Sequence, residues 1–474
     1  MTRRLVLIVT TLAAALGARA RAQEEQPPTV LSVRPAKAPV PALRYRLLPD
    51  ASKLIPGNAA IFYHRAIEGL LRADLASRTQ KLSATPPPPD EMGEVRVILN
   101  SQRSILHEIE QGALREACDW EFRRREEGFS LDISEIQQTR SLARLVALQV
   151  QFDIAEGRID SAIHWIQTGL SLARHVGESQ FYIQSLVAAA ITEEMAKSIE
   201  ALIQAPGCPN LYWALAALPR PFLDLTSATE GERYFLEREF PRLRGADEAV
   251  WSLEQARAFG DELERKGGLL LGRWTFPKST LTQPTVDDLA QHLIIAGLVA
   301  RAYPEAKRAL VASGMTSERV EAMPAIQAVA IHSYRNFEEK RDDLFKWANL
   351  PYSQGHRGMA EAEKNAFAGA PIGIPFVSIL PGIRSVFNVP VRIDRRFAAI
   401  QTIEAVRQYA ASHDGSPPPS LAALTETPAP LDPVTGRVFD YAVNGPTVSL
   451  TAPPPPGLER VSQYVVHYEI KLAR

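Results

Sequence analysis

The sequence is poor in cysteine, with only Cys118 and Cys208 among its 474 residues. Two cysteines are too few for a disulfide-stabilised small scaffold or for a zinc ribbon built on cysteine ligands. In an oxidising compartment these two could form one disulfide, worth about 4 kcal/mol for a loop of this length. The alternative is two buried free thiols. The sequence leaves both open.

Neither sign of charge is in excess, because 53 basic side chains stand against 54 acidic ones and the net charge is −1. A surface for nucleic acid or for anionic lipid requires clustered lysine and arginine. The two signs are instead interspersed along the chain. We therefore expect no nucleic-acid partner.

Long apolar runs are also absent, apart from one short stretch near the start of the chain. Leu5–Leu16 follows two arginines and spans twelve residues, fewer than the about 20 that cross a bilayer. Small residues then mark cleavage sites after Ala20 or Ala22. This order is typical of a secretory signal peptide over 1–22. It predicts a periplasmic or secreted protein with no transmembrane helix once the signal is removed; a retained anchor is the alternative.

The body of the chain has a helical pattern. Apolar side chains recur every three or four residues between about Asn58 and Leu350, and strand-like alternation is nearly absent. After a proline-rich tether over 23–42, we expect a helical body over 43–369, made of irregular, stacked antiparallel helical hairpins. The predicted helices cover 58–81, 90–116, 134–156, 159–175, 180–204, 246–265, 286–302 and 318–348.

The pattern changes near residue 370. A proline- and glycine-rich apolar connector over 370–392 is expected to lead to a small α+β domain over 393–474. Its helix is predicted at 394–413. Alternating apolar side chains then predict three strands, around Phe439–Val443, Val448–Leu450 and Tyr464–Leu472. One helix on a three-stranded antiparallel sheet is the expected arrangement.

One segment of the body, 141–175, resembles a tetratricopeptide helical hairpin. Gly157 lies at the turn, and Ala162, Ile166 and Gly169 occupy the packing positions of the second helix. The resemblance covers a single repeat, and Asp153 stands where the repeat usually has an aromatic residue. Because a repeat array needs several copies to bury its faces, we expect an irregular stack.

The C-terminal part resembles the globular head of type II secretion pseudopilins. The motif residues are Pro419-Ser420-Leu421, Leu424, Asp432-Pro433, Thr435-Gly436, Phe439 and Tyr441. Pseudopilins carry an apolar assembly helix directly before this head, whereas roughly 350 residues of other protein precede it here. The resemblance therefore implies a structural or docking module.

The whole mature chain also resembles an uncharacterised family of secreted helical proteins from planctomycete-type bacteria. That resemblance implies an extracytoplasmic location and supplies no mechanism. The segments that carry it are Ala42–Pro49, Pro56–Ala60, Cys118–Trp120, His175–Glu178, Pro209–Leu215 and Leu218–Pro221.

Recognisable catalytic motifs are missing. The sequence has no H-E-x-x-H, G-x-S-x-G, P-loop or G-x-G-x-x-G, so we expect no cofactor and no metal, and catalytic residues stay unknown. Carboxylate and imidazole groups do occur four residues apart on predicted helices. A metal site needs three or four converging ligands, so each such pair alone predicts a surface ion pair. The pairs are His64 with Glu68, Asp160 with His164, and Asp288 with His292.

Three aromatic side chains are candidates for an interaction surface or cleft: Trp120, Tyr212 and Trp213. Tryptophan beside an acid can line a ligand cleft, although such residues are more often core anchors. Together these features favour a non-catalytic protein-interaction or scaffold protein with a partner in the cell envelope. The alternatives are a hydrolase with scattered carboxylate and histidine residues, or an accessory component of a secretion or pilus-like machine. Nothing indicates the oligomeric state.

Overall fold

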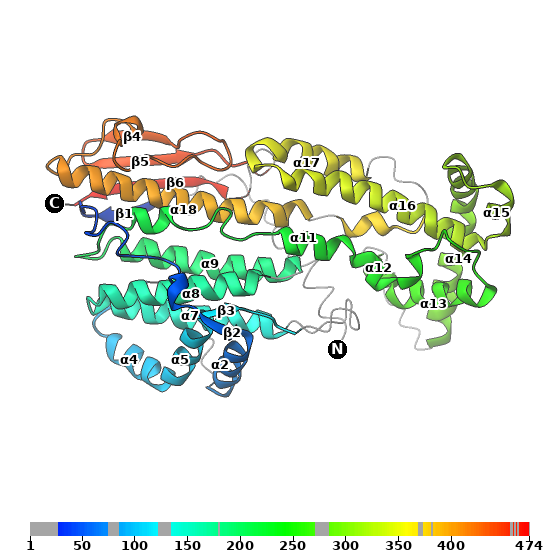
Figure 1. Ribbon diagram of the computed structural model, residues 1–474, viewed down its shortest axis with the longest axis horizontal. Coiled ribbons are helices and arrows are strands. Elements are labelled where there is room, and N and C mark those ends of the chain that lie inside the picture. The colour runs from blue at the N-terminus through cyan, green and yellow to red at the C-terminus, as the bar shows by residue number, and fades with distance from the viewer. Residues whose placement is uncertain are drawn as a thin grey trace. The chain divides into compact units, whose positions relative to one another are not determined.

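The computed structural model is mainly helical, with one small sheet (Figure 1). The structure describes residues 27–73, 85–121, 134–178, 181–270, 284–367, 373–380, 383–455, 458, 461 and 464–473. The expected signal peptide over 1–22 and the first residues of the expected tether lie outside this described part.

The chain divides into two compact units. The inserted unit comprises the described residues of Glu230–Ser385. The sheet unit comprises the described residues before Glu230 and those from Val386 onward. The units therefore do not follow the expected boundary between a body over 43–369 and a domain over 393–474. Helices of the expected body and the C-terminal segment share one unit instead.

The sheet unit contains most of the predicted helices. The predictions for 134–156, 159–175 and 180–204 are confirmed within two residues at each end. The predicted helix over 90–116 is interrupted at Gln102, where the Ser101 hydroxyl donates to the Ile98 carbonyl and competes with the helical ladder. The helices are α2 (Ala60–Ala73), α4 (Met92–Ser101), α5 (Arg103–Ala113), α7 (Ser134–Ala155), α8 (Ile159–Gly177), α9 (Tyr182–Leu202), α10 (Tyr212–Ala216), α11 (Thr226–Arg233), which continues into the inserted unit, and α18 (Ile383–Ser412).

Glycines allow α7, α8 and α9 to turn and to pack closely. Gly157 has a φ of +72° in the turn between α7 and α8, a conformation that glycine adopts without strain. A Cβ atom at Gly169 of α8 would lie 2.1 Å from the Met195 sulfur of α9. The side chain of Met195 thus fills the space that the missing Cβ leaves.

The sheet has four strands, one more than expected. The strand order is β1 (Thr29–Val33), β6 (Val466–Leu472), β5 (Thr447–Ala452), β4 (Asp440–Asn444). The pairs involving β5 are antiparallel, as predicted, whereas β1 runs parallel to β6, with Leu31 opposite Ile470. Part of the expected tether is therefore a strand. Leu31 and Val33 are buried, so their alternation places an apolar face on the core.

A second, smaller sheet has two parallel strands. It pairs β2 (Ile55–Asn58) with β3 (Arg115–Ala117). This pairing holds the segment before α2 against the segment after α5.

Helix α18 begins earlier than predicted. It starts at Ile383, eleven residues before the predicted start at Asp394, so the second half of the expected irregular connector is helical. Pro390 lies inside the helix, where a proline removes one backbone hydrogen bond. Phe387 and Val389 are buried on this stretch, and Phe387 contacts Tyr182 edge-to-face at 5.8 Å. Tertiary packing therefore outweighs the local penalty of proline.

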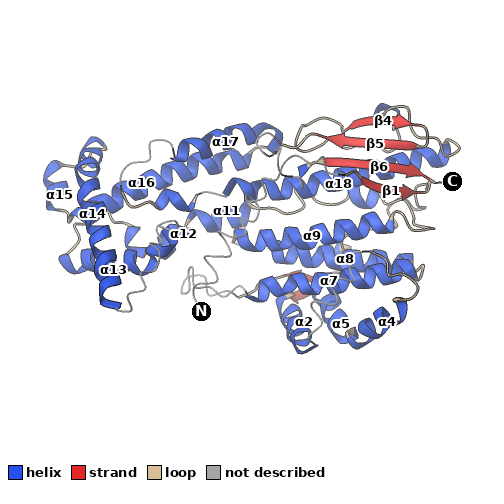
Figure 2. Cartoon of the chain, turned by 180° about the vertical axis from the view of Figure 1, so that it is seen from behind, coloured by secondary structure: helices blue, strands red, loops and turns tan. Residues whose placement is uncertain are grey.

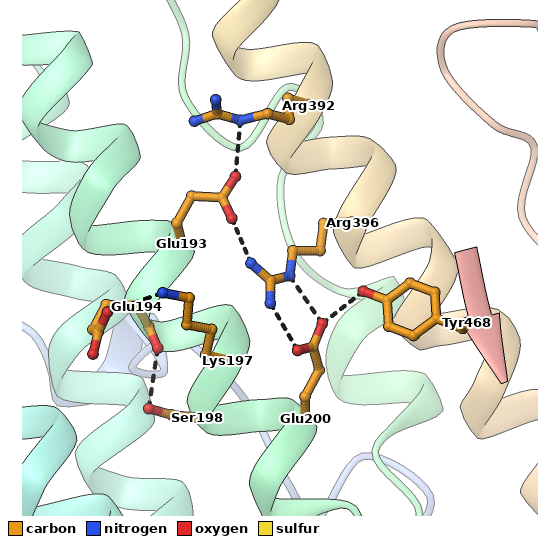
Figure 3. A network of polar contacts seen from close by, with 8 residues as sticks. All are labelled: Glu193, Glu194, Lys197, Ser198, Glu200, Arg392, Arg396 and Tyr468. Atoms are coloured by element: carbon orange, nitrogen blue, oxygen red, sulfur yellow. Dashed lines mark hydrogen bonds and ion pairs between the residues drawn. The ribbon is translucent and has the colours of Figure 1, made fainter. Parts of the chain in front are cut away.

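The sheet unit is layered around α18. Figures 1 and 2 show α18 lying along the sheet and α9 next to both, with α8 and α7 beyond α9 and α2, α4 and α5 on the far side. Charged side chains connect the central layers (Figure 3). Arg396 of α18 binds Glu200 of α9 at 2.7 Å and Glu193 at 2.5 Å. The Tyr468 hydroxyl of β6 donates to the same Glu200 at 2.6 Å, so one carboxylate joins α9, α18 and the sheet.

A buried ion pair connects α18 to the turn before β4. Arg395 is 1% exposed and Asp432 is 0% exposed, and their closest N–O distance is 2.9 Å. Arg395 also donates to the carbonyls of Tyr464 and Pro453. The other Asp432 oxygen caps the Val434 amide. This one arginine therefore holds the turn and the segments next to β5 and β6.

A second buried ion pair lies further along α18. Glu404 and Arg407 approach at 2.5 Å and both are almost fully buried. Glu404 also accepts from the Leu211 amide at 2.6 Å, and Arg407 donates to the carbonyls of Arg34 and Cys208. The pair thus fixes the chain after β1 and the chain before α10 on one helix.

Asp394 is a half-buried carboxyl on α18 whose protonation we expect to affect stability. It accepts from the Phe222 amide at 2.9 Å, and burial raises its pKa to about 6, while that hydrogen bond and the charge of Arg220 act against the rise. Between pH 4 and 6 the folded state retains a proton that the unfolded state has lost. The free energy of unfolding should therefore fall as pH rises through this range.

The matched variant Asp394→Asn keeps an oxygen for the Phe222 amide and cannot ionise. We expect it to unfold with the same free energy as the parent near pH 4 and to be more stable by about 2 kcal/mol at pH 7. Urea denaturation at a series of pH values measures both. A parent protein as stable as the variant at pH 7 would contradict the assignment.

The inserted unit is a helical cluster with its own core. Phe240 contacts Phe259 and Phe376, and all three are fully buried. Gln327 is buried and bonds the backbone of three residues between Ala246 and Trp251. The longer helices of the inserted unit are α13 (Leu253–Leu270), α14 (Pro284–Ala312), α16 (Ala325–Phe345) and α17 (Tyr352–Phe367). Its short helices include α12 (Phe235–Glu239) and α15 (Ser317–Ala322).

Membrane-spanning character is absent from the helices of the described residues. None of them is both long enough and apolar enough to cross a bilayer.

Candidate functional site

Both cysteines are free in the structure, and both belong to the sheet unit. Burial raises the pKa of the Cys118 thiol, and the nearby Glu178 and Asp119 add to the rise. Burial also raises the pKa of Cys208 to about 12. Because the thiolate is the reactive form, neither cysteine is an activated nucleophile at neutral pH.

Trp120 lies in a buried aromatic cluster. Its ring stacks on Tyr63 at 5.9 Å and meets His64 edge-on at 5.2 Å. The Tyr63 hydroxyl hydrogen-bonds to His175 Nδ1 at 2.8 Å. Burial lowers the pKa of His175 to about 4, partly opposed by a hydrogen bond to the Arg115 backbone. Tyrosine and histidine are thus both neutral here and act as a packed, hydrogen-bonded pair.

Asn58 connects two of the segments on which the family resemblance rests, Pro56–Ala60 and Cys118–Trp120. Its side chain donates to the Asp119 carbonyl at 2.7 Å and accepts from the Asp119 amide at 2.9 Å. It also accepts from the Ala60 amide at the start of α2. Asn58 therefore fastens the segment around Trp120 to α2. These segments form a structural joint between α2, β3 and α8.

Tyr212 and Trp213 lie at a different place. The Tyr212 hydroxyl donates to the Pro428 carbonyl at 2.7 Å, and its ring meets Trp213 edge-on at 5.0 Å. Tyr212 is buried and Trp213 is half-buried. Within the described part of the chain, the ring contacts of Trp120 involve neither of them. The structure therefore does not unite the three candidate aromatics in one cleft.

A cleft of about 380 Å³ is present among other residues of the sheet unit. Helices α4, α5, α7 and α8 and the turn between α7 and α8 supply its walls. Its lining residues are Arg96, Leu99, Asn100, Arg103, Leu106, His107, Glu110, Gln149, Phe152, Arg158 and Trp165.

Asp153 holds two residues of the cleft lining, Arg158 and Gln149, in place. It is fully buried and binds Arg158 at 2.6 Å, while the Ser161 hydroxyl and the Gln149 amide also donate to it. Three donors satisfy the buried carboxylate, which stabilises it without water. The residue that departs from the tetratricopeptide pattern thus orients the Arg158 guanidinium.

Two arginines flank one aromatic ring in the same wall. Arg96 and Arg158 both bind Glu156, at 2.8 and 2.9 Å. Their guanidinium carbons lie 5.7 and 5.1 Å from the centroid of Phe152. The charge of each is therefore shared with an acid of the protein.

The lining also contains a histidine–glutamate pair. His164 Nε2 lies 2.8 Å from Glu110, and His107 lies 3.8 Å from the same carboxylate. Trp165 meets the His164 ring edge-on at 5.5 Å and is half-buried, so part of its indole faces the cleft.

Arg103 differs from the other arginines of the cleft. It lies at the start of α5 and is exposed. Among the described residues, no acidic side chain pairs with Arg103. It is the one lining arginine whose charge the described part of the protein leaves uncompensated.

The predicted carboxylate–imidazole pairs are arranged differently in the structure. His164 binds Glu110, whereas Asp160 lies beside Tyr45. His64 lies 3.1 Å from Glu135. The side chains of the third pair, Asp288 and His292, lie outside the described residues. Among those that are described, no three histidine, cysteine or acidic side chains are grouped so that they could hold a metal.

Comparison with protein-family models, with curated proteins and with solved structures gives no match.

Proposed function

We propose that this chain is a non-catalytic interaction or scaffold protein of the cell envelope, and that the cleft between α4, α5, α7 and α8 is its docking site. The observation that carries the proposal is a cleft lined by Arg103, which pairs with no acidic side chain of the described residues, and by a half-buried tryptophan, Trp165. Such a mixture of apolar surface and a few oriented polar groups is typical of ligand clefts. The envelope location rests on the signal-peptide pattern over 1–22.

The resemblances refine this proposal. The turn at Gly157 and the close approach at Gly169 support a tetratricopeptide-like hairpin formed by α7 and α8. Asp432 is buried and caps the turn before β4, which supports a pseudopilin-head-like arrangement around β4 to β6. Under this proposal the C-terminal segment is a structural module and a second docking surface, for example in a secretion machine.

The cleft favours binding over hydrolysis. Hydrolysis by paired acids needs two carboxylates placed on either side of the scissile bond. Glu110 is the carboxylate among the lining residues, and His164 already binds it. A ligand in the cleft would meet arginine, amide and aromatic side chains first.

Site-specific photo-cross-linking in cells tests the proposal. A benzophenone amino acid replaces Val97, which is 69% exposed on α4 beside Arg96. Matched probes replace Leu293, 65% exposed in the inserted unit, and Val443, 41% exposed on β4. We expect a discrete protein adduct with the probe at Val97 and none with the probe at Leu293.

The pattern of adducts separates the possibilities. An adduct only at Val443 would place docking on the C-terminal segment and contradict the cleft. Adducts at none of the three sites would contradict the interaction proposal altogether. A chain truncated near Val391 is not a suitable test of docking by the C-terminal segment. The truncation removes most of α18 and three of the four strands of the sheet, so it would disrupt the sheet unit itself.

A further inference from the structure

We infer that the cleft recognises a peptide segment that carries a carboxylate next to an apolar side chain, with Arg103 binding the carboxylate and Trp165 contacting the apolar group. This inference rests on the proposed function and specifies its ligand.

The charges of the cleft lead to this ligand. Arg96 forms an ion pair with Glu156, and Arg158 forms one with Asp153. Glu110 binds His164. These groups are oriented but largely neutralised by each other. Arg103 contributes an additional positive charge that the described residues do not balance. A ligand that enters with a single negative charge would balance it.

Arginine favours a carboxylate because its planar guanidinium can donate two parallel hydrogen bonds. In open water such a contact contributes little, since solvent competes for both groups. The lining of the cleft changes this balance. Leu99, Leu106 and Trp165 would exclude water on one side of the contact when an apolar group covers them.

A doubly charged ligand fits less well. A phosphate carries more than one negative charge at neutral pH, and its second charge would compete with Glu156 and Asp153 for their arginines. Asp153 holds Arg158 from a fully buried position with three donors, so this arrangement is costly to break. A single carboxylate leaves it intact.

A peptide also accounts for the remaining lining groups. The Asn100 side chain is exposed at the cleft, and an amide can both donate to and accept from a peptide backbone. The volume of about 380 Å³ accommodates one or two side chains, and not a folded surface. Val97 follows Arg96 on α4 and is exposed.

The experiment uses the purified full chain and three blocked pentapeptides of identical frame: acetyl-Ala-Glu-Leu-Phe-Ala-amide and the versions with Gln or Lys in place of Glu. Calorimetry and saturation-transfer NMR measure binding into the millimolar range. We expect the Glu peptide to bind about tenfold more tightly than the Gln peptide, and the Lys peptide more weakly than either.

Variants assign the preference to its residues. Arg103→Ala should bring the Glu and Gln peptides to equal affinity, and Arg103→Lys should retain part of the difference. Trp165→Ala should weaken both peptides by the same factor. The control Arg301→Ala removes an exposed arginine of the inserted unit and should change nothing.

Each outcome decides between the two proposals. Equal binding of the Glu and Gln peptides to the parent, weakened by Trp165→Ala, would overturn the inference while leaving the docking cleft in place. A preference that survives Arg103→Ala would also overturn it. Absence of binding by all three peptides would overturn the inference, whereas the probe at Val97 decides separately whether the cleft docks a protein.

Discussion

Replacing Asp432 by alanine should lower the free energy of unfolding of the sheet unit by about 3–5 kcal/mol. The substitution leaves the charge of Arg395 buried without its acid, and it also removes the cap on the Val434 amide. An uncompensated buried charge is among the largest single-residue penalties in folded proteins. Urea denaturation followed by tryptophan fluorescence measures the loss.

The control for this prediction is Asp440→Ala, which removes an exposed carboxylate at the start of β4 and should cost less than about 0.5 kcal/mol. Asp432→Asn keeps one acceptor oxygen, enough for either Arg395 or the Val434 amide, and should fall between the two. Equal stabilities for the Asp432→Ala and Asp440→Ala variants would show that the ion pair contributes nothing to the fold.

Glu404→Ala should cost a similar amount, about 3–5 kcal/mol, for two reasons. Arg407 loses its acid in a fully buried position, and the Leu211 amide loses its acceptor. We also expect faster proteolysis after residue 33, because Arg407 holds the Arg34 carbonyl in place. Limited proteolysis beside urea denaturation measures both effects.

Glu404→Gln is the matched variant for that position. It retains an oxygen for the Leu211 amide and loses the charge and the acceptor that bind Arg407, so its cost should lie below that of alanine. If the glutamine variant is as unstable as the alanine variant, the interaction of Glu404 with Arg407 accounts for its whole contribution. If neither variant loses stability, the joint does not depend on Glu404.

Local signals made much of the helical fold predictable. The turn at Gly157 and the three- and four-residue spacing of apolar side chains define α7 and α8 without tertiary information. The start of α18 could not be predicted in this way, because Pro390 is a local signal against a helix, and burial of Phe387 outweighs it.

The edge strand β1 and the cleft depend on residues that meet only in the fold. Thr29 pairs with Tyr468, and a short apolar alternation in a proline-rich segment gives no hint of a partner that distant. Arg96 and Arg103 are seven residues apart, the spacing of one face of the predicted helix over 90–116, so a search for basic residues at that period would have found them, although the structure places them on α4 and α5. Their convergence with Trp165 of α8 required the structure.

The parallel pairing of β1 with β6 has a consequence for the order in which the molecule is made. The ribosome releases Thr29 roughly 440 residues before Tyr468, so β1 waits roughly 20–90 seconds for its partner at ordinary elongation rates. The residues between them include the inserted unit, which is a compact unit and can fold during this interval. The sheet unit is therefore the last part to close, and a chain interrupted before Val466 would leave Leu31 and Val33 without their neighbours.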